Sequence, residues 1–290
     1  MNRQGISKAR FAEKTSNLSS LATLLMALSV AACGGGGGGN DPGGAGGSGG
    51  SSGDAGTVPL NCTSSGDRGE MVSVPAGEFL MGCNSAVDNQ CEPREQPGRQ
   101  VTLNAFQIDK TEVTQDQYTA CVDAGACAEP ACEWNCEQMD LPATCILWAD
   151  AKKYCEWAGK RLPSEAEWEK AARGTDGRKF PWGNEAPSCE LLNMVDCVDG
   201  ASPAGAYPDG ASPYGALDMA GNMVEMVADW YDERYYQSAP STNPKGPGTG
   251  TTFSGRGGGW LSAAVWHRTS QRDWYGQDKQ GKSLGFRCAQ

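Results

Sequence analysis

The chain has 290 residues and a formal net charge of −11 at pH 7, with 20% charged and 39% hydrophobic residues. This acidic balance excludes a basic nucleic-acid-binding surface. The single histidine, His267, excludes any metal site that needs two or three histidines. Residues 34–56 hold 14 of the 40 glycines and almost nothing apolar. The remaining sequence is long enough for one large domain with a hydrophobic core.

The N-terminus is typical of an exported bacterial lipoprotein. Basic residues precede an apolar stretch over 21–30, which is too short to span a bilayer but suits a signal peptide. It ends in small residues directly before Cys33, which resemble a lipobox. We expect a signal peptide over 1–32 and, over 33–69, a lipidated Cys33 followed by a flexible glycine-rich tether. The alternative is an ordinary signal peptide with a chance cysteine.

These features predict a location in the bacterial cell envelope. Gly34 follows the cysteine, and by resemblance to Gram-negative lipoproteins a residue other than aspartate favours the outer membrane or cell surface. The negative charge of the chain opposes attraction to anionic lipids. We therefore expect the lipid on Cys33 to be the only membrane attachment.

The first elements of the domain read as strands. Residues 71–74 alternate apolar and polar side chains, Gly77 turns the chain, and residues 78–82 return. This pattern predicts a β-hairpin. Further strands are expected over 101–103 and 106–108.

Three helices are expected next. The first begins with a capping box over 114–117. The second covers about 147–158, where apolar residues recur at spacings of three and four before a glycine. The third covers 164–174 and opens with a second capping box. Beyond these helices only short strands are expected, near 256–260 and 284–289, so the sequence predicts a mixed α+β domain rich in irregular structure over 70–290.

Twelve cysteines follow Cys33. An even number in an exported chain is typical of a disulfide framework. Spacing does not determine connectivity, but close pairs could staple local loops and contribute about 2–3 kcal/mol each. The spacing of Cys132 and Cys136 is also compatible with zinc, which remains the alternative for that pair. The four close pairs are Cys83/Cys91, Cys121/Cys127, Cys132/Cys136 and Cys189/Cys197.

Seven ordered segments stand out within the domain. The longest, A-G-K-R-L-P-S-E-A-E-W-E over 158–169, is specific enough to exclude chance similarity. Together the segments resemble the formylglycine-generating enzyme family, or sulfatase-modifying-factor domain. The resemblance implies a single irregular α+β fold related to C-type lectin-like domains. The segments are 74–82, 112–114, 158–169, 180–184, 221–225, 256–260 and 284–289.

The resemblance also implies structural features. A disulfide would join Cys155 to Cys288 and close a loop of well over 100 residues, which is where the entropic effect is largest, near 5 kcal/mol.

Two structural calcium sites are implied as well, because calcium prefers oxygen donors. One would use Asn193, the backbone carbonyl of Met194, and Asp199. The other would use Asn222 and Glu225. The alternative is that these residues order their loops by hydrogen bonds without metal.

Members of this family oxidise a substrate cysteine to formylglycine with molecular oxygen and copper(I), which is held by two cysteines. The corresponding positions, counted from Trp260, are Ser262 and His267. Neighbouring Gly259 and Met226 also depart from the family pattern. A hydroxyl is a poor copper(I) ligand, and one imidazole does not replace a thiolate pair. We therefore expect neither copper binding nor formylglycine generation.

Two other uses of this segment are open. Ser262 and His267, with Asp273 orienting the ring, could act as nucleophile and base if they lie within hydrogen-bond reach. This would give the protein hydrolytic or other new chemistry. The broader alternative is an oxidoreductase or other enzyme of the family with altered active-site chemistry. A purely structural role, with a vestigial cleft, is the third possibility.

The leading prediction is a module that binds a peptide, protein or glycan. Aromatic and arginine side chains gather in this segment and suit such ligands, although about half of the aromatics could instead fill the core. Lectin-like relatives of this fold display variable ligand-binding surfaces on lipoproteins in the same segment. The predicted cleft residues are Gly259, Trp260, Ser262, Trp266, His267, Arg268 and Arg272.

Overall fold

The computed structural model describes residues 62–290. The expected signal peptide, the lipid site at Cys33 and most of the expected tether lie outside the described residues. Within 62–290, no helix has both the length and the apolar character needed to cross a membrane. The helices are α1 (Gln115–Asp123), α2 (Trp148–Trp157), α3 (Glu165–Arg173) and α4 (Tyr235–Ser238). The strands are β1 (Met71–Val74), β2 (Gly77–Met81), β3 (Arg99–Leu103), β4 (Phe106–Asp109), β5 (Val224–Trp230), β6 (Thr252–Arg256), β7 (Asp273–Gly276) and β8 (Leu284–Phe286).

The predicted hairpin between the first two strands is wrong. Gly77 does turn the chain, with φ at 138°, but β1 pairs with β4 and β2 pairs with β3, both antiparallel. β3 and β4 carry Val101, Leu103 and Ile108, which are at most 2% exposed. In this pairing the apolar side chains of β3 and β4 are buried in the domain.

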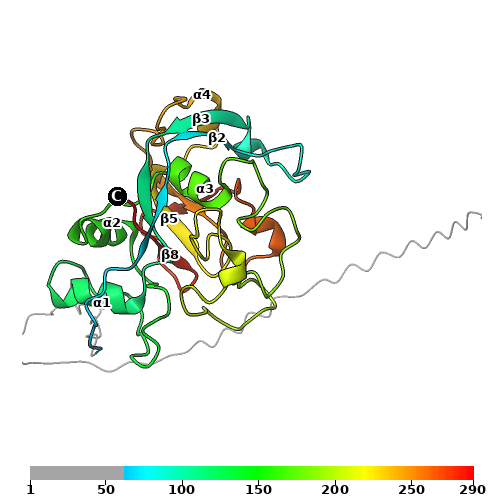
Figure 1. Ribbon diagram of the computed structural model, residues 1–290. Helices are drawn as coiled ribbons and strands as arrows, with labels where there is room; N and C mark the ends of the chain where they lie inside the picture. The colour runs from blue at the N-terminus through cyan, green and yellow to red at the C-terminus, as the bar shows by residue number, and fades with distance from the viewer. Residues whose placement is uncertain (1–61) are drawn as a thin grey trace, which may run out of the picture. The chain divides into compact units, whose positions relative to one another are not determined.

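A four-stranded sheet with the order β7-β6-β5-β8 forms the centre of the domain (Figure 1). β8 runs parallel to β5, and the other pairs are antiparallel. Helices α1 and α2 share one hydrophobic core with Met226 and Phe286 of this sheet. Helix α3 and the ribbons of β1–β4 share a second core with Val227. Because side chains alternate along a strand, Glu225 faces α3, where it accepts a hydrogen bond from Trp168.

The three expected helices are confirmed as α1, α2 and α3. Both capping boxes are present, from Thr114 and from Ser164. The strand expected near 256–260 ends at Arg256, because Gly257 and Gly258 adopt φ angles of 88° and 68°. That left-handed turn directs the following segment out of the sheet.

Six disulfides pair all twelve cysteines of the described part. Three of the four expected local pairs are present, and the Cys155–Cys288 bridge is present as well. The pairing of Cys132 with Cys136 is wrong, and the zinc alternative for these two fails with it. Cys132 instead pairs with Cys145, and Cys136 pairs with Cys62. The spacing of the cysteines in the sequence does not indicate these partners. The bridges are Cys62–Cys136, Cys83–Cys91, Cys121–Cys127, Cys132–Cys145, Cys155–Cys288 and Cys189–Cys197.

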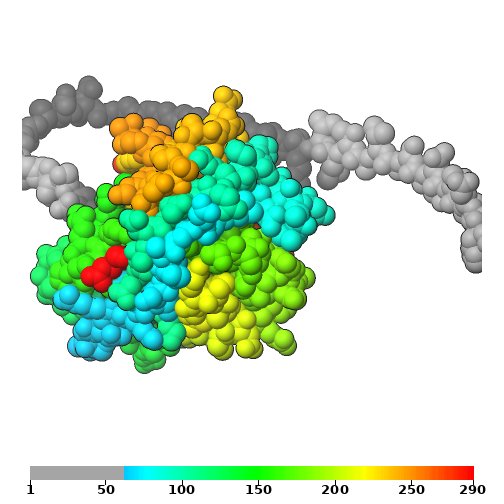
Figure 2. All heavy atoms as spheres, turned by 45° about the horizontal axis from the view of Figure 1, so that its top comes forward, coloured from blue at the N-terminus to red at the C-terminus, as the bar shows by residue number. Residues whose placement is uncertain are grey.

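The C-terminal residues are built into the domain. Ala289 forms isolated bridges with Ile108 and Arg161, and Gln290 exchanges backbone hydrogen bonds with Gln107. In Figure 2 the red C-terminal residues emerge among blue-green and green segments. The Cys155–Cys288 bridge lies just before this point and joins α2 to the chain after β8.

Candidate functional site

The segment after β6 forms one wall of an open pocket of about 550 Å3. Gly257 and Gly258 turn this segment away from the sheet, a short 3-10 helix (Ala264–His267) follows, and β7 returns it. The lining combines aromatic rings with one cation and one carboxyl group. The lining residues are Arg94, Leu261, Ser262, Ala263, Trp266, Asp273, Trp274 and Tyr275.

Arg94 is held between two indole rings of the pocket. Its guanidinium carbon lies 5.7 Å from the ring centroid of Trp266 and 5.2 Å from that of Trp274. Glu92 pairs with the same guanidinium at 2.5 Å, and Tyr231 stacks on Trp274 at 5.1 Å. Cation–π contacts on two rings and one ion pair fix the arginine in place before any ligand arrives.

Only two of the seven predicted cleft residues line this pocket, namely Ser262 and Trp266. Trp260 is half-buried and lines a neighbouring hollow, which meets the pocket at Leu261. Gly259 is buried and donates its backbone N–H to Ser262 Oγ at 3.1 Å. The other three, His267, Arg268 and Arg272, have no exposed surface.

Arg268 and Arg272 are core ion-pair partners, which corrects their assignment to the cleft. Arg268 pairs with Glu95 at 2.6 Å and with Asp88 at 2.9 Å. Arg272 pairs with Glu165 at 2.7 Å. A buried guanidinium needs such carboxylate partners. All three partners are remote in sequence, so the neighbouring residues could not reveal this role.

Ser262 and His267, the alternative nucleophile and base, do not meet. The imidazole nitrogens of His267 lie 3.0 and 3.2 Å from the backbone carbonyls of Gly257 and Ser262. Ser262 Oγ instead accepts from Gly259. Burial lowers the pKa of His267, and the two carbonyls oppose this only in part. His267 therefore anchors the turn after β6, and the Ser–His arrangement needed for nucleophilic catalysis is not formed.

Arg94 is the pocket residue that sequence reasoning missed. It belongs to a 3-10 helix (Pro93–Glu95) far upstream of the aromatic segment. Its backbone carbonyl accepts a hydrogen bond from Arg272, which holds this helix against β7. No motif around Arg94 distinguishes it from other surface arginines, so only the tertiary contact identifies it.

The family model for the sulfatase-modifying factor enzyme 1-like domain matches residues 57–290. The chain belongs to the sulfatase-modifying-factor family. It is 31% identical over 283 residues to the formylglycine-generating enzyme of Thermomonospora curvata, covering 76% of this chain and 92% of that protein. It is 29% identical over 257 residues to the hercynine oxygenase of Mycolicibacterium smegmatis, covering 75% and 60%.

Two solved structures agree with the fold. PvdO from Pseudomonas aeruginosa superposes with a TM-score of 0.67 and 28% identity, covering 80% of this chain and 98% of that one. Treponema denticola variable protein 1 superposes with a TM-score of 0.62 and 21% identity, covering 76% and 94%. At that lower identity, the second similarity shows the fold alone.

The first expected calcium site has a donor that fits a cation. Asn193 is fully buried, and its Oδ1 has no hydrogen-bond partner. The Nδ2 of Asn193 donates to the carbonyl of Gly200 at 2.8 Å, so Oδ1 points away from that carbonyl. Asp199, directly before Gly200, is exposed. A buried, unpartnered amide oxygen is a suitable calcium ligand.

The second expected calcium site does not fit. Asn222 Oδ1 already accepts from Asn193 Nδ2 and from the backbone N–H of Ser202. Glu225 forms a two-pronged ion pair with Arg287, at 2.7 Å for each contact. The occupied amide oxygen and the adjacent guanidinium charge both oppose a cation at these two residues.

Glu112 is a buried carboxyl group that the sequence did not single out. Its Oε1 accepts from Asn222 at 3.1 Å, but its Oε2 has no partner. Burial raises the pKa of Glu112 well above its ordinary 4.5, and the neighbouring Asp218 and Glu225 carboxylates raise it further. Burial likewise raises the pKa of Asp218.

A pH-dependent stability follows from Glu112. The folded-state pKa of Glu112 is raised. The stability that its protonated side chain contributes is therefore fully present below pH 4.5 and is lost as the pH rises through the raised pKa. Glu112→Gln keeps a side-chain oxygen that accepts the hydrogen bond from Asn222. Its new amide N–H group adds a donor on the side of the Asp218 carboxyl group. We expect this variant to be more stable than the parent by about 1–3 kcal/mol at pH 8 and to differ little at pH 4. Denaturant unfolding at both pH values checks this, and equal effects at both would contradict it.

Proposed function

We propose that this protein is a ligand-binding member of the sulfatase-modifying-factor family that does not oxidise cysteine. The observation that carries the proposal is the pocket at the family's copper position. Ser262 and the buried His267 stand where the family has thiolates, and a fixed arginine and exposed aromatic rings stand beside them. Leu261 and Trp274 are 61% and 49% exposed, and exposed apolar side chains around a pocket are typical of binding sites.

In this proposal the ligand is a peptide, protein or glycan. The protein that binds it is anchored in the bacterial envelope and displays the pocket there. The N-terminal sequence supports export, lipidation of Cys33 and a glycine-rich tether. A lipid anchor at the outer membrane or cell surface would leave the pocket free to meet extracellular ligands.

A binding screen tests the proposal. The full-length chain is immobilised and probed with a random-peptide phage library and a glycan array. We expect binders whose affinity falls about 30-fold or more in Trp274→Ala, as for a central interface aromatic. Trp157→Ala is the matched control, because Trp157 lies at the end of α2 and outside the pocket lining. Binders that are insensitive to Trp274→Ala would contradict the assignment of this pocket.

The second candidate is an enzyme with altered chemistry. It is favoured by the relatives named as formylglycine-generating enzymes and hercynine oxygenase, and by Asp273, whose pKa burial raises at the pocket wall. Incubation with copper(I), oxygen and a C-x-P-x-R peptide, followed by mass spectrometry, separates the candidates. We expect no aldehyde product. Conversion of the peptide would overturn the binding-module proposal.

We also propose one structural calcium ion at Asn193, the Met194 carbonyl and Asp199. The ion would satisfy the unpartnered Oδ1 of Asn193. We expect calcium to raise the melting temperature of the protein relative to a chelator, and Asn193→Ala to abolish that difference. A calcium effect that persists in Asn193→Ala would place the ion elsewhere.

A further inference from the structure

A small pocket of about 200 Å3 lies beside the loop that follows α1. It is lined by the start of α1, by the disulfide-bonded loop after that helix and by one indole from the segment after β6. It shares no lining residue with the larger pocket at Ser262, so it is a separate site. We call it the Trp134 pocket, and its lining includes Gln115, Trp134, Leu141, Pro142, Trp260 and Lys282.

Two buried polar atoms of this lining have no hydrogen-bond partner among residues 62–290. Trp134 Nε1 is a donor and Gln115 Oε1 is an acceptor, and the two residues are 8% and 5% exposed. Gln115 Nε2 donates to the Pro142 carbonyl at 3.4 Å, so Oε1 is the unpaired end of this amide. Buried polar groups in folded proteins are nearly always paired. One unpaired donor and one unpaired acceptor in the same lining therefore indicate a site for an external partner.

Two disulfides hold the Trp134 indole in place. Cys132, two residues before it, is bonded to Cys145. Cys136, two residues after it, is bonded to Cys62. The unpaired N–H group is therefore fixed before a ligand arrives, which lowers the entropic cost of binding.

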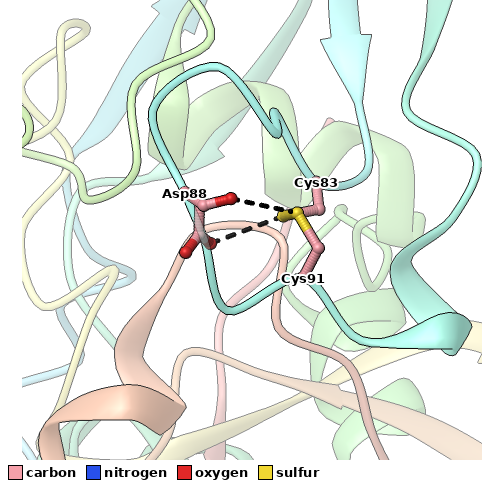
Figure 3. A group of neighbouring side chains, drawn as sticks. All are labelled: Cys83, Asp88 and Cys91. Carbon is pink, nitrogen blue, oxygen red and sulfur yellow. Dashed lines mark hydrogen bonds between the residues drawn. A yellow bond between two sulfur atoms is a disulfide. The ribbon is translucent and has the colours of Figure 1, made fainter.

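A disulfide-bonded loop does not by itself leave a buried polar side chain unpaired. In the loop closed by Cys83 and Cys91, Asp88 lies beside the bridged sulfurs (Figure 3). Its carboxylate oxygens are paired with Lys179 at 3.1 Å and with Arg268 at 2.9 Å. Both oxygens of that buried side chain are satisfied, so the unpaired indole of the Trp134 pocket is not a general result of such loops.

We propose that the Trp134 pocket binds the acetamido group of an N-acetylated amino sugar. The acetamido carbonyl oxygen accepts from Trp134 Nε1, and the acetamido N–H donates to Gln115 Oε1. Leu141 and Pro142 offer apolar surface to the methyl group. A pocket of about 200 Å3 suits a terminal group of this size. A peptide amide in mid-chain continues on both sides and needs a longer groove.

The more exposed lining residues suit the sugar ring that carries the acetamido group. Trp260 is half-buried, and its Nε1 donates to the Lys282 carbonyl at 3.3 Å, which fixes the indole. Its ring offers an apolar face to the C–H groups of a sugar. Glu133 and Asn135 are exposed members of the lining, and their side chains can form hydrogen bonds with hydroxyl groups.

The first experiment compares two sugars on the unaltered protein. The full-length chain is titrated with the methyl glycosides of N-acetylglucosamine and of glucose, followed by calorimetry and by saturation-transfer NMR of the acetyl methyl group. We expect the glucoside, which has a hydroxyl in place of the acetamido group, to bind about 30-fold more weakly, because two hydrogen bonds are lost. This comparison does not depend on the folding of a variant.

The second experiment removes each unpaired group in turn. Trp134→Phe removes the donor, and Gln115→Leu removes the acceptor. We expect each to weaken binding of the acetamido sugar by about 5-fold or more and to leave the affinity for the glucoside unchanged. Trp182→Phe is the matched control, because the Trp182 indole donates to the Glu185 carbonyl at 3.1 Å outside this lining. Circular dichroism checks that each variant is folded.

Trp274→Ala separates this site from the pocket at Ser262. Trp274 lines only the latter pocket of the two, so the variant should bind the acetamido sugar as the parent does. Loss of sugar binding in Trp274→Ala would place the sugar in the other pocket and overturn the assignment.

Four other results would overturn the proposal. The first is no measurable binding of either glycoside, in which case water alone satisfies the two polar groups. The second is equal affinity for the two glycosides. The third is undiminished binding of the acetamido sugar by folded Trp134→Phe and Gln115→Leu. The fourth is binding of N-acetylalanine N-methylamide as tightly as the sugar, which would assign the pocket to a peptide amide.

Discussion

Replacing Arg268 by alanine is expected to destabilise the fold by about 3–5 kcal/mol, because it leaves the buried carboxylate of Glu95 without its cation and takes one of two cations from Asp88. Arg268 and Glu95 are both 0% exposed, so water cannot replace the lost partner. Denaturant unfolding measures the change. The same substitution would also disturb the pocket, so a loss of ligand binding in Arg268→Ala is not evidence that Arg268 contacts the ligand.

The matched control is Arg161→Ala. Arg161 also makes two hydrogen bonds to one glutamate, Glu167, at 2.7 Å each, but its side chain is 48% exposed. An exposed pair contributes about 0–1 kcal/mol. If both alanine variants lose the same stability, the burial argument for Arg268 is wrong.

Removing the Cys155–Cys288 bridge is expected to cost about 5 kcal/mol, because it closes a 133-residue separation and restricts the unfolded chain the most. The double variant Cys155→Ala/Cys288→Ala tests this by denaturant unfolding. We expect it to be largely unfolded at 37 °C, since such a loss approaches the whole stability of a typical domain.

The control for this prediction is Cys121→Ala/Cys127→Ala. That bridge spans six residues, and the same loop-entropy relation gives about 2 kcal/mol for it. The first variant removes two fully buried side chains and the control removes one, because Cys127 is only partly buried. Equal losses from the two variants would contradict the entropic explanation.

Buried ion pairs form part of the core of this domain. Five arginines are among the largest fully buried side chains, and all five pair with Glu95, Glu165, Glu169 or Glu225 at 3.2 Å or less. Such pairs contribute little net stability but are costly to break. The wall of the candidate pocket therefore rests on charged contacts that tolerate few changes. The five arginines are Arg173, Arg256, Arg268, Arg272 and Arg287.

The sequence by itself determined the local structure and the family. Each capping box, at Thr114 and at Ser164, joins two residues that are three apart in the sequence. Because both partners lie within one short segment, the segment itself specifies the contact. The ordered motifs identify the family for the same reason, since each is a short contiguous segment. The absence of cysteine at 262 and 267 is likewise a direct property of the sequence.

Only the tertiary structure decided which side chains meet. β1 pairs with β4 and β2 pairs with β3, and Cys136 forms a disulfide with Cys62. Arg268 was expected at the surface and lies in the core, because carboxylates far away in sequence neutralise it there. Arg94, which no motif marks, was brought into the pocket by the same packing. Burial and charge pairing depend on contacts between distant segments, and no local pattern encodes them.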